Sequence, residues 1–170
     1  MSSPFPFSVT TILKRLLPLW PPFAASGIAP VHVNLDPSGG EVKVKLQQTL
    51  WNRTYYNVHF GGSLYAMSDP FYVFILSHHL GKDHIIWDLA ANIRFRKATK
   101  ETVYATFRVS ADEIRAIREG ALQNYKVEPE FEADIVTPDG EVVASVWKKL
   151  YVRRKDAKDR FPRPISSPDT

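Results

Sequence analysis

The sequence predicts an α+β domain in which a curved antiparallel sheet wraps around one long central helix. Of the 170 residues, 44% are hydrophobic and 12% aromatic, enough for the core of a single domain. Residues 59–81 are apolar nearly throughout, and a helix that is apolar on all sides must be surrounded by other elements. Segments on both sides alternate apolar and polar residues, as strands with one buried face do. A sheet folded around a helix satisfies both patterns.

The N-terminal residues 1–27 predict a helix followed by an extended crossover. Residues 8–17, SVTTILKRLL, have an amphipathic pattern, with Ser8 or Thr10 available as the cap and Pro18 as the end. The following segment, PLWPPF, is rich in proline, which favours extended backbone in the residue before it. We therefore expect an extra N-terminal helix outside the main domain.

Six strands are expected in the main domain, residues 28–153. The turn DPSGG joins the first two strands, and TPDGE joins the last two. Between the fourth and fifth strands, ADEIRAIREGA predicts a short charged helix with Ser110 as N-cap and Glu113 as its capping-box partner. The strands are expected at residues 28–35, 41–50, 85–96, 102–110, 125–137 and 141–153.

The net charge of +4 is concentrated at the C-terminus. Residues 151–170 contain six basic and three acidic side chains, so the remainder of the chain carries only +1. A nucleic-acid-binding protein usually has a basic face on its folded body, so this distribution argues against nucleic acid as a partner. We expect residues 154–170 to form a basic, flexible tail.

Other features of the sequence favour a cytoplasmic protein without a metal or organic cofactor. The chain contains no cysteine, and therefore no disulfide and no thiolate metal site. No stretch of 18 apolar residues predicts a membrane span. The N-terminus lacks the basic start and the long apolar run of a signal peptide.

The segment 59–81, HFGGSLYAMSDPFYVFILSHHLG, contains the residues best suited to chemistry. Gly61 and Gly62 allow the backbone to approach another backbone or a ligand closely. Asp69 is the one carboxylate in this apolar run, where an unpaired acid is costly. Aspartate followed by proline is also a common helix start, with the acid as N-cap and Pro70 at the first helical position.

The order of elements, with HFGGSLYAMSDPF at its centre, resembles the hotdog fold and most closely the thioesterases of the phenylacetate-pathway type. Those proteins carry His-Gly-Gly and then an aspartate seven residues after the second glycine, a spacing that Gly62 and Asp69 keep. The motif FGGSLYAM followed by DPFY is similar to that of an uncharacterised subgroup of the superfamily. The resemblance covers residues 28–153, and with it we favour one long helix, kinked near Pro70, over a helix that begins there.

The resemblance implies thioester hydrolysis with Asp69 as general base or nucleophile. The amides of Gly61 and Gly62, at a helix N-terminus, would polarise the thioester carbonyl. Two helical turns span about 11–12 Å, so Asp69 does not easily reach a carbonyl bound at Gly61 of the same protomer. In the family a second subunit supplies the acid, and we expect self-association as a dimer or tetramer.

Several positions depart from the pattern of this family. Phe60 stands where the family has its histidine, which leaves His59, one residue earlier, as a candidate for orienting the substrate or as a structural residue. The family's asparagine falls nearest Asn52, and Asn57 is a rival. The resemblance therefore offers His59, Asn52 and Asn57 as the candidate polar residues of the site beside Asp69 and the glycines.

Basic side chains gather in the segment IRFRKATK. They suit the phosphates of coenzyme A, which favour arginine forks, or form a solvated outer face. Tyr65 belongs to the apolar segment, either in the core or along an acyl pocket. The basic candidates are Arg94, Arg96, Lys97 and Lys100.

These residues lead to hypotheses of different kinds. The first is an acyl-CoA thioesterase, with acyl carrier protein as the alternative carrier. The second is a non-catalytic dimer that binds acyl-CoA or lipid, which the missing histidine and the Asp-Pro kink favour. The third is a pure assembly scaffold.

Overall fold

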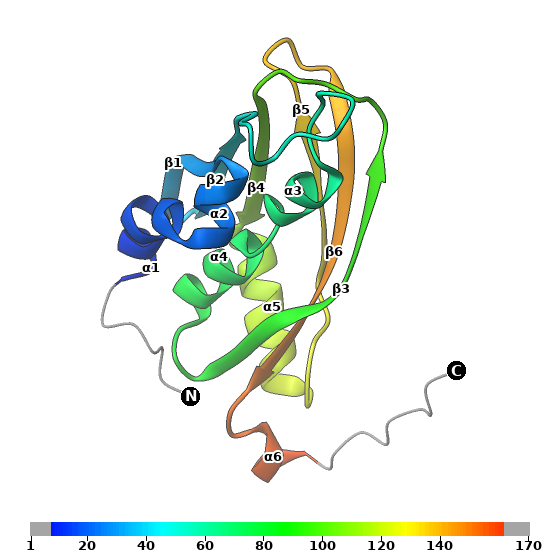
Figure 1. Ribbon diagram of the computed structural model, residues 1–170. Coiled ribbons are helices and arrows are strands. Elements are labelled where there is room, and N and C mark those ends of the chain that lie inside the picture. The colour runs from blue at the N-terminus through cyan, green and yellow to red at the C-terminus, as the bar shows by residue number, and fades with distance from the viewer. Residues whose placement is uncertain (1–7, 162–170) are drawn as a thin grey trace.

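The computed structural model describes residues 8–161 and contains one six-stranded antiparallel sheet, as the sequence predicts (Figure 1). The strands are β1 (Ile28–Asp36), β2 (Gly39–Leu46), β3 (His84–Phe95), β4 (Val103–Ser110), β5 (Glu130–Val136) and β6 (Val142–Arg154). Their order in the sheet is β1-β2-β4-β5-β6-β3, so β1 and β3 form its edges. The long strands β3 and β6 bend together along one side of the molecule (Figure 1).

The N-terminal segment is helical on both sides of Trp20, and the expected extended crossover is wrong. The Ser8 side chain accepts a hydrogen bond from the Thr11 amide at 3.2 Å, which confirms one of the two predicted caps. Two prolines occupy the first turn of α2, where no intrahelical N–H bond is lost. The elements are α1 (Val9–Thr11), the π-helical turn η1 (Ile12–Leu16), the 3₁₀ turn η2 (Leu17–Leu19) and α2 (Pro21–Ser26).

The central helical segment lies where the sequence predicts it, but it is interrupted rather than only kinked. It consists of α3 (Gly61–Ala66) and α4 (Phe71–Leu80). The alternative, a helix capped by Asp69, is also wrong, because no side chain caps the start of α4. Asp69 instead lies in the short connection between the two helices.

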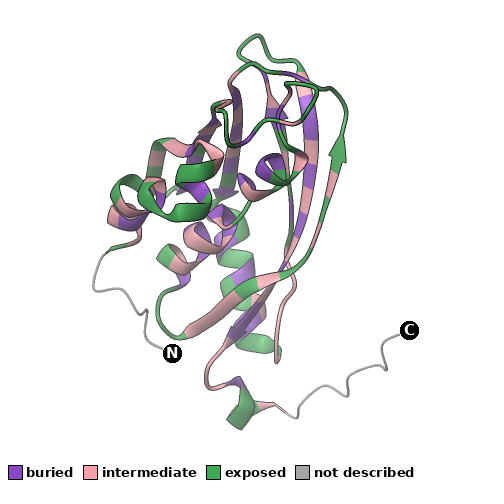
Figure 2. Cartoon of the chain, in the orientation of Figure 1, coloured by how far each residue is buried: buried purple, intermediate pink, exposed green. Residues whose placement is uncertain are grey.

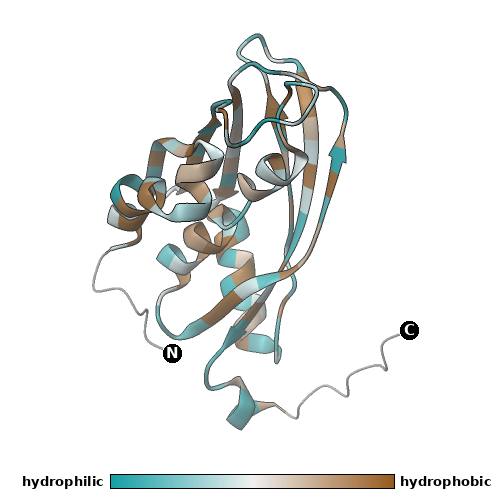
Figure 3. Ribbon diagram, viewed as in Figure 1, coloured by the Kyte–Doolittle hydropathy of each residue, from teal (hydrophilic) through white to brown (hydrophobic). Residues whose placement is uncertain are grey.

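The core lies between α4 and the strands (Figures 2 and 3). The Phe71 ring stacks on Phe107 of β4 with centroids 5.1 Å apart, and the Tyr72 ring stacks on Phe131 of β5 at 4.6 Å. The Tyr72 hydroxyl donates a hydrogen bond to the Glu132 carbonyl at 2.8 Å. Within residues 8–161, no helix is long and apolar enough to cross a membrane.

The helix α5 (Ala111–Gln123) confirms the predicted capping box. The Ser110 side chain accepts from the Glu113 amide at 3.3 Å, and the Glu113 carboxylate accepts from the Ser110 amide at 2.7 Å. The amides of Ser110 and Glu113, at the N-terminal end of α5, are thereby both paired at the junction with β4.

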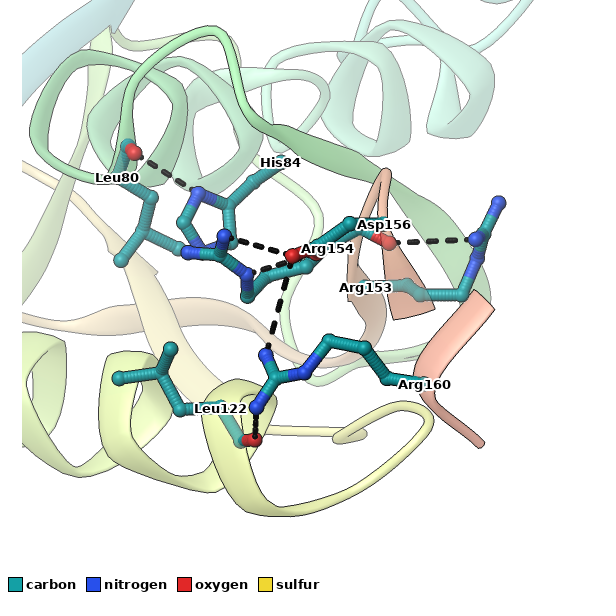
Figure 4. A network of polar contacts seen from close by, with 7 residues as sticks. All are labelled: Leu80, His84, Leu122, Arg153, Arg154, Asp156 and Arg160. Carbon is teal, nitrogen blue, oxygen red and sulfur yellow. Dashed lines mark hydrogen bonds and ion pairs between the residues drawn. The ribbon is translucent and has the colours of Figure 1, made fainter. Parts of the chain in front are cut away.

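Part of the segment expected as a flexible tail is held against the domain (Figure 4). The helix α6 (Ala157–Arg160) follows β6, and the Arg154 guanidinium donates to the Asp156 carboxylate at 2.8 and 3.0 Å. Arg160 donates to the Leu122 carbonyl at the end of α5, at 3.0 Å. The expected tail at residues 162–170 lies outside the described residues.

Candidate functional site

A cavity of about 340 Å³ lies at the N-terminal end of α3, beside the end of β3. His59 and Gly61 line it from the helix side, and Phe95, Arg96 and Lys97 line it from the strand side. The cavity therefore brings together three of the predicted polar groups and one of the paired glycines.

The amides of Gly61 and Gly62 have no hydrogen-bond acceptor within residues 8–161. The first bonds of α3 run from Ser63 and Leu64 to the Phe60 carbonyl, at 2.9 and 3.2 Å. A short helix leaves its leading N–H groups free in this way, available to an oxygen of a ligand. These two donors are the feature of the site best suited to polarise a carbonyl.

Two aromatic rings cover the paired glycines. A Cβ atom on Gly61 would lie 3.1 Å from the Phe95 ring, and one on Gly62 would lie 2.3 Å from the Phe60 ring. Both rings are more than half exposed to solvent. The glycines thus let aromatic side chains approach the free amides, which a larger residue would prevent.

His59 is buried beside the cavity, with 5% of its surface exposed. Its Nε2 lies 2.7 Å from the Glu101 carbonyl, and burial lowers the pKa of the imidazole. A neutral ring with its proton on Nε2 donates to that carbonyl and leaves Nδ1 as an acceptor. Nδ1 is buried and has no partner among the residues of the structure described.

Three of the four basic candidates line one or both of two cavities. Arg96 lines the cavity at α3, and it also lines a second cavity of about 450 Å³, together with Arg94, on the outer face of the sheet. Arg96 Nε donates to Ser145 Oγ at 2.9 Å. Lys97 forms an exposed ion pair with Glu141. Lys100 is exposed and lines neither cavity.

The Asn52 side chain serves the local backbone. The Asn52 amide donates to the Ser26 and Gln47 carbonyls at 2.5 and 2.8 Å, and its oxygen accepts from the Thr49 amide at 2.7 Å. Those bonds use both of its donor hydrogens, so we leave Asn52 out of the proposed site.

Asn57 and Tyr65 do not line the cavity at α3. Asn57 is exposed, with φ of 58°, a left-handed conformation that asparagine tolerates in turns. Tyr65 is 40% exposed on α3, outside the core.

Asp69 lies beyond the other end of α3 and lines neither cavity. Its Oδ1 accepts a hydrogen bond from Lys148 Nζ at 3.2 Å, and 53% of its side chain is exposed. The same Nζ lies 3.0 Å from Oδ1 of Asp88. The lone acid of the apolar segment is therefore paired, and its partner comes from β6.

Asp88 is the most perturbed acid of this cluster. Its pKa is raised to about 6, chiefly by burial and further by the adjacent Asp69 side chain, while Lys148 acts in the opposite direction. Its Oδ1 has no hydrogen-bond donor of good geometry in the described chain, although Nζ is near. Neither Asp88 nor Lys148 is among the site residues predicted from the sequence. The available signal was Lys148 in the inward series with Val146 and Leu150.

The enclosed helical segment and the strand order define the class of this protein as a hotdog-like α+β fold. The chain belongs to the DUF4442 family, a domain of unknown function, which matches residues 10–152. No curated protein matches the sequence.

Solved structures with the same fold cover most of the chain. A Pseudomonas aeruginosa protein of unknown function, described as a probable thioesterase, has a TM-score of 0.71 at 18% identity, over 86% of this chain and 93% of its own. A Chlorobaculum tepidum protein of unknown function reaches 0.70 at 13% identity, over 86% and 95%. A Haemophilus influenzae thioesterase reaches 0.62 at 13% identity, over 87% and 92%. At these identities the likeness concerns the fold.

Proposed function

We propose that the protein hydrolyses acyl thioesters, in the manner of hotdog thioesterases of the phenylacetate-pathway type. The observation that carries this proposal is the pair of free amides at Gly61 and Gly62, the first of which lines a cavity with basic residues beside it. The fold shared with a Haemophilus influenzae thioesterase supports the reaction class. The DPFY segment supports the subgroup only through the sequence resemblance.

In the proposed reaction the thioester carbonyl oxygen accepts hydrogen bonds from the Gly61 and Gly62 amides. The Asp69 carboxylate removes a proton from water as the water oxygen bonds to the carbonyl carbon. The tetrahedral intermediate then collapses, the carbon–sulfur bond breaks, and the thiolate takes the proton back from Asp69. His59 Nδ1 orients the water by accepting a hydrogen bond from it.

Asp69 and Gly61 lie at opposite ends of α3, which supports a site formed by two protomers. The edge strand β3 pairs with β6 on one side, and Trp87, Leu89 and Phe95 along it are each about half exposed. An exposed, partly apolar edge is a ready surface for a second copy of the chain. We therefore include a dimer or tetramer in the proposal, with Asp69 supplied by one copy and the glycine amides by another.

The proposed substrate is acyl-CoA, with an acyl group of medium length or an aromatic one, and acyl carrier protein is the alternative carrier. Arg94, Arg96, Lys97 and Lys100 lie on or just after the end of β3, and Arg96 and Lys97 line the cavity at α3. Guanidinium and ammonium groups in this position suit the phosphates of the carrier. Tyr65, exposed on α3, is proposed to contact the substrate outside the cavity.

A second candidate is a non-catalytic dimer that binds acyl-CoA or lipid. Two observations favour it: Phe60 replaces the histidine of the family, and the Asn52 amide is fully used by the backbone. Such a protein would bind acyl-CoA in the same cavity without turnover.

A panel of acyl-CoAs separates the two candidates. We expect the wild type to release free coenzyme A and Asp69→Asn to lose turnover while it still binds acyl-CoA. Asp83→Asn, an exposed acid in a turn, is the matched control and should keep wild-type turnover. Binding without turnover by the wild type would replace the thioesterase proposal with the binding protein.

A further inference from the structure

Lys148 is a buried cation on β6, the strand next to the edge strand β3. It points to the same face of β6 as Val146 and Leu150, which are fully or almost fully buried. Only 3% of its side chain is exposed. A buried ammonium is costly unless it is paired, so its partners indicate why it is there.

Two acids from different elements meet this ammonium. Asp69 comes from the connection between α3 and α4, with Oδ1 at 3.2 Å, and Asp88 comes from β3, with Oδ1 at 3.0 Å. A bulge in the pairing of β3 with β6 between Asp88 and Ala90 turns Asp88 to the inner face. Two carboxylates facing one ammonium leave either a net negative charge or one bound proton.

The other elements packed around the cluster bring uncharged groups. β5 places Phe131 opposite Lys148, and β6 places Leu150 opposite Asp88. From α4, Tyr72 stacks on Phe131, and burial raises the pKa of its hydroxyl, so that it stays neutral. The charges that act on Asp88 are therefore those of Asp69 and Lys148.

Exposure rises along the cluster from Lys148, at 3%, through Asp88, at 29%, to Asp69, at 53%. Asp69 is thus the residue of the cluster that a substrate or water can reach, while Asp88 and Lys148 are more deeply buried. We propose that Lys148 is a positioning residue for Asp69 and that Asp69 and Asp88 share one proton beside its ammonium. This inference rests on the proposed function for the task that Asp69 performs.

The pH profile of kcat/KM for acyl-CoA hydrolysis tests this arrangement. In the wild type we expect the acid limb near pH 6, where the cluster loses its shared proton. Asp88→Asn should lower that limb by about one pH unit or more, because one carboxylate then faces the ammonium alone. Lys148→Met should raise it by a similar amount, since the two acids then face each other without a cation. Lys148→Arg keeps the charge and should restore the wild-type limb.

If Lys148 had only a structural role, Lys148→Met would lower activity. The acid limbs of Asp88→Asn and Lys148→Met would then not shift in opposite directions. Circular dichroism identifies any variant that fails to fold, and Asp88→Asn, which changes no volume, then decides the question. Acid limbs of kcat/KM at the same pH in Asp88→Asn and Lys148→Met would overturn the inference.

A second measurement is independent of turnover. Carbon-13 NMR of the aspartate side chains of the full chain should show a carboxyl that titrates near pH 6 and is lost in Asp88→Asn. Absence of that titration would overturn the claim that Asp69 and Asp88 share a proton, whether or not the protein hydrolyses acyl thioesters. If the titration appears but no acyl thioester is hydrolysed, the proposed function fails while the shared proton stands.

Discussion

Lys148 Nζ lies 3.2 Å from Oδ1 of Asp69, so a buried cation in β6 holds the half-exposed acid at the break between α3 and α4. This contact explains how a single carboxylate is accommodated within an otherwise apolar segment. It also gives Asp69 a fixed position relative to the sheet, which a base or nucleophile requires.

The raised pKa of Asp88 makes the stability of the fold depend on pH. The carboxyl has a pKa of about 6 in the folded chain and about 3.9 when unfolded, so the folded state binds the proton more tightly. Its stabilising contribution is complete below about pH 4 and is lost as the pH rises to about 6, on the order of 2–3 kcal/mol at most.

Asp88→Asn should flatten this pH dependence of the free energy of unfolding, measured by urea denaturation between pH 4 and 7. Glu119→Gln, an exposed acid on α5, should leave it unchanged. Equal slopes for the wild type and Asp88→Asn would show that Asp88 ionises normally.

The close approach of Phe95 to Gly61 predicts that a small side chain at this glycine disturbs the site. In Gly61→Ala the new Cβ would lie 3.1 Å from the Phe95 ring at the edge of the cavity, so the ring must shift. We expect kcat/KM for acyl-CoA to fall roughly 10²-fold. Adding Phe95→Ala should recover much of that loss, and no recovery in the double variant would indicate that the ring is not the cause.

The buried hydroxyl of Tyr72 predicts a measurable loss on its removal. It donates to the Glu132 carbonyl at 2.8 Å. Tyr72→Phe should reduce the free energy of unfolding by about 1 kcal/mol, because the carbonyl loses its donor. Tyr56→Phe, at a side chain 83% exposed, is the control and should change it little. Thermal denaturation of both variants checks this, and equal losses would count against the hydrogen bond.

His59 is predicted to be neutral at pH 7 with its proton on Nε2. Burial lowers the pKa of its imidazole, and the Glu101 carbonyl accepts from Nε2. The unfolded chain therefore binds the proton more readily, and this histidine costs stability as the pH falls below about 6.5. Nitrogen-15 NMR of the imidazole reads the tautomer directly, and a charged ring at pH 7 would remove Nδ1 as an acceptor.

The strands and α5 were predictable because their signals are local. Alternating residues and turn sequences marked the six strands, and Ser110 with Glu113 marked the start of α5. The helix α2 was missed because Pro-Pro suggests extended backbone, although proline also fits a first helical turn.

The cluster of Asp69, Asp88 and Lys148 was hidden by register. Strict alternation from Ile93 would turn Asp88 outward, but the bulge before Ala90 reverses the side on which the earlier residues lie. Lys148 is followed by a second lysine, and only its alternation with Val146 and Leu150 indicates which of the two is buried. Such a contact depends on the pairing of β3 with β6, which no short segment of sequence specifies.

The most direct test of the proposed two-protomer site is a mixed dimer. Asp69→Asn lacks the base, and Gly61→Val obstructs the free amides, so each variant alone should be inactive. A dimer that carries one copy of each, purified through two different affinity tags, has one intact site of two. We predict that it hydrolyses acyl-CoA at about half the wild-type rate. A mixed dimer as inactive as its parents would contradict the sharing of Asp69 and the glycine amides between protomers.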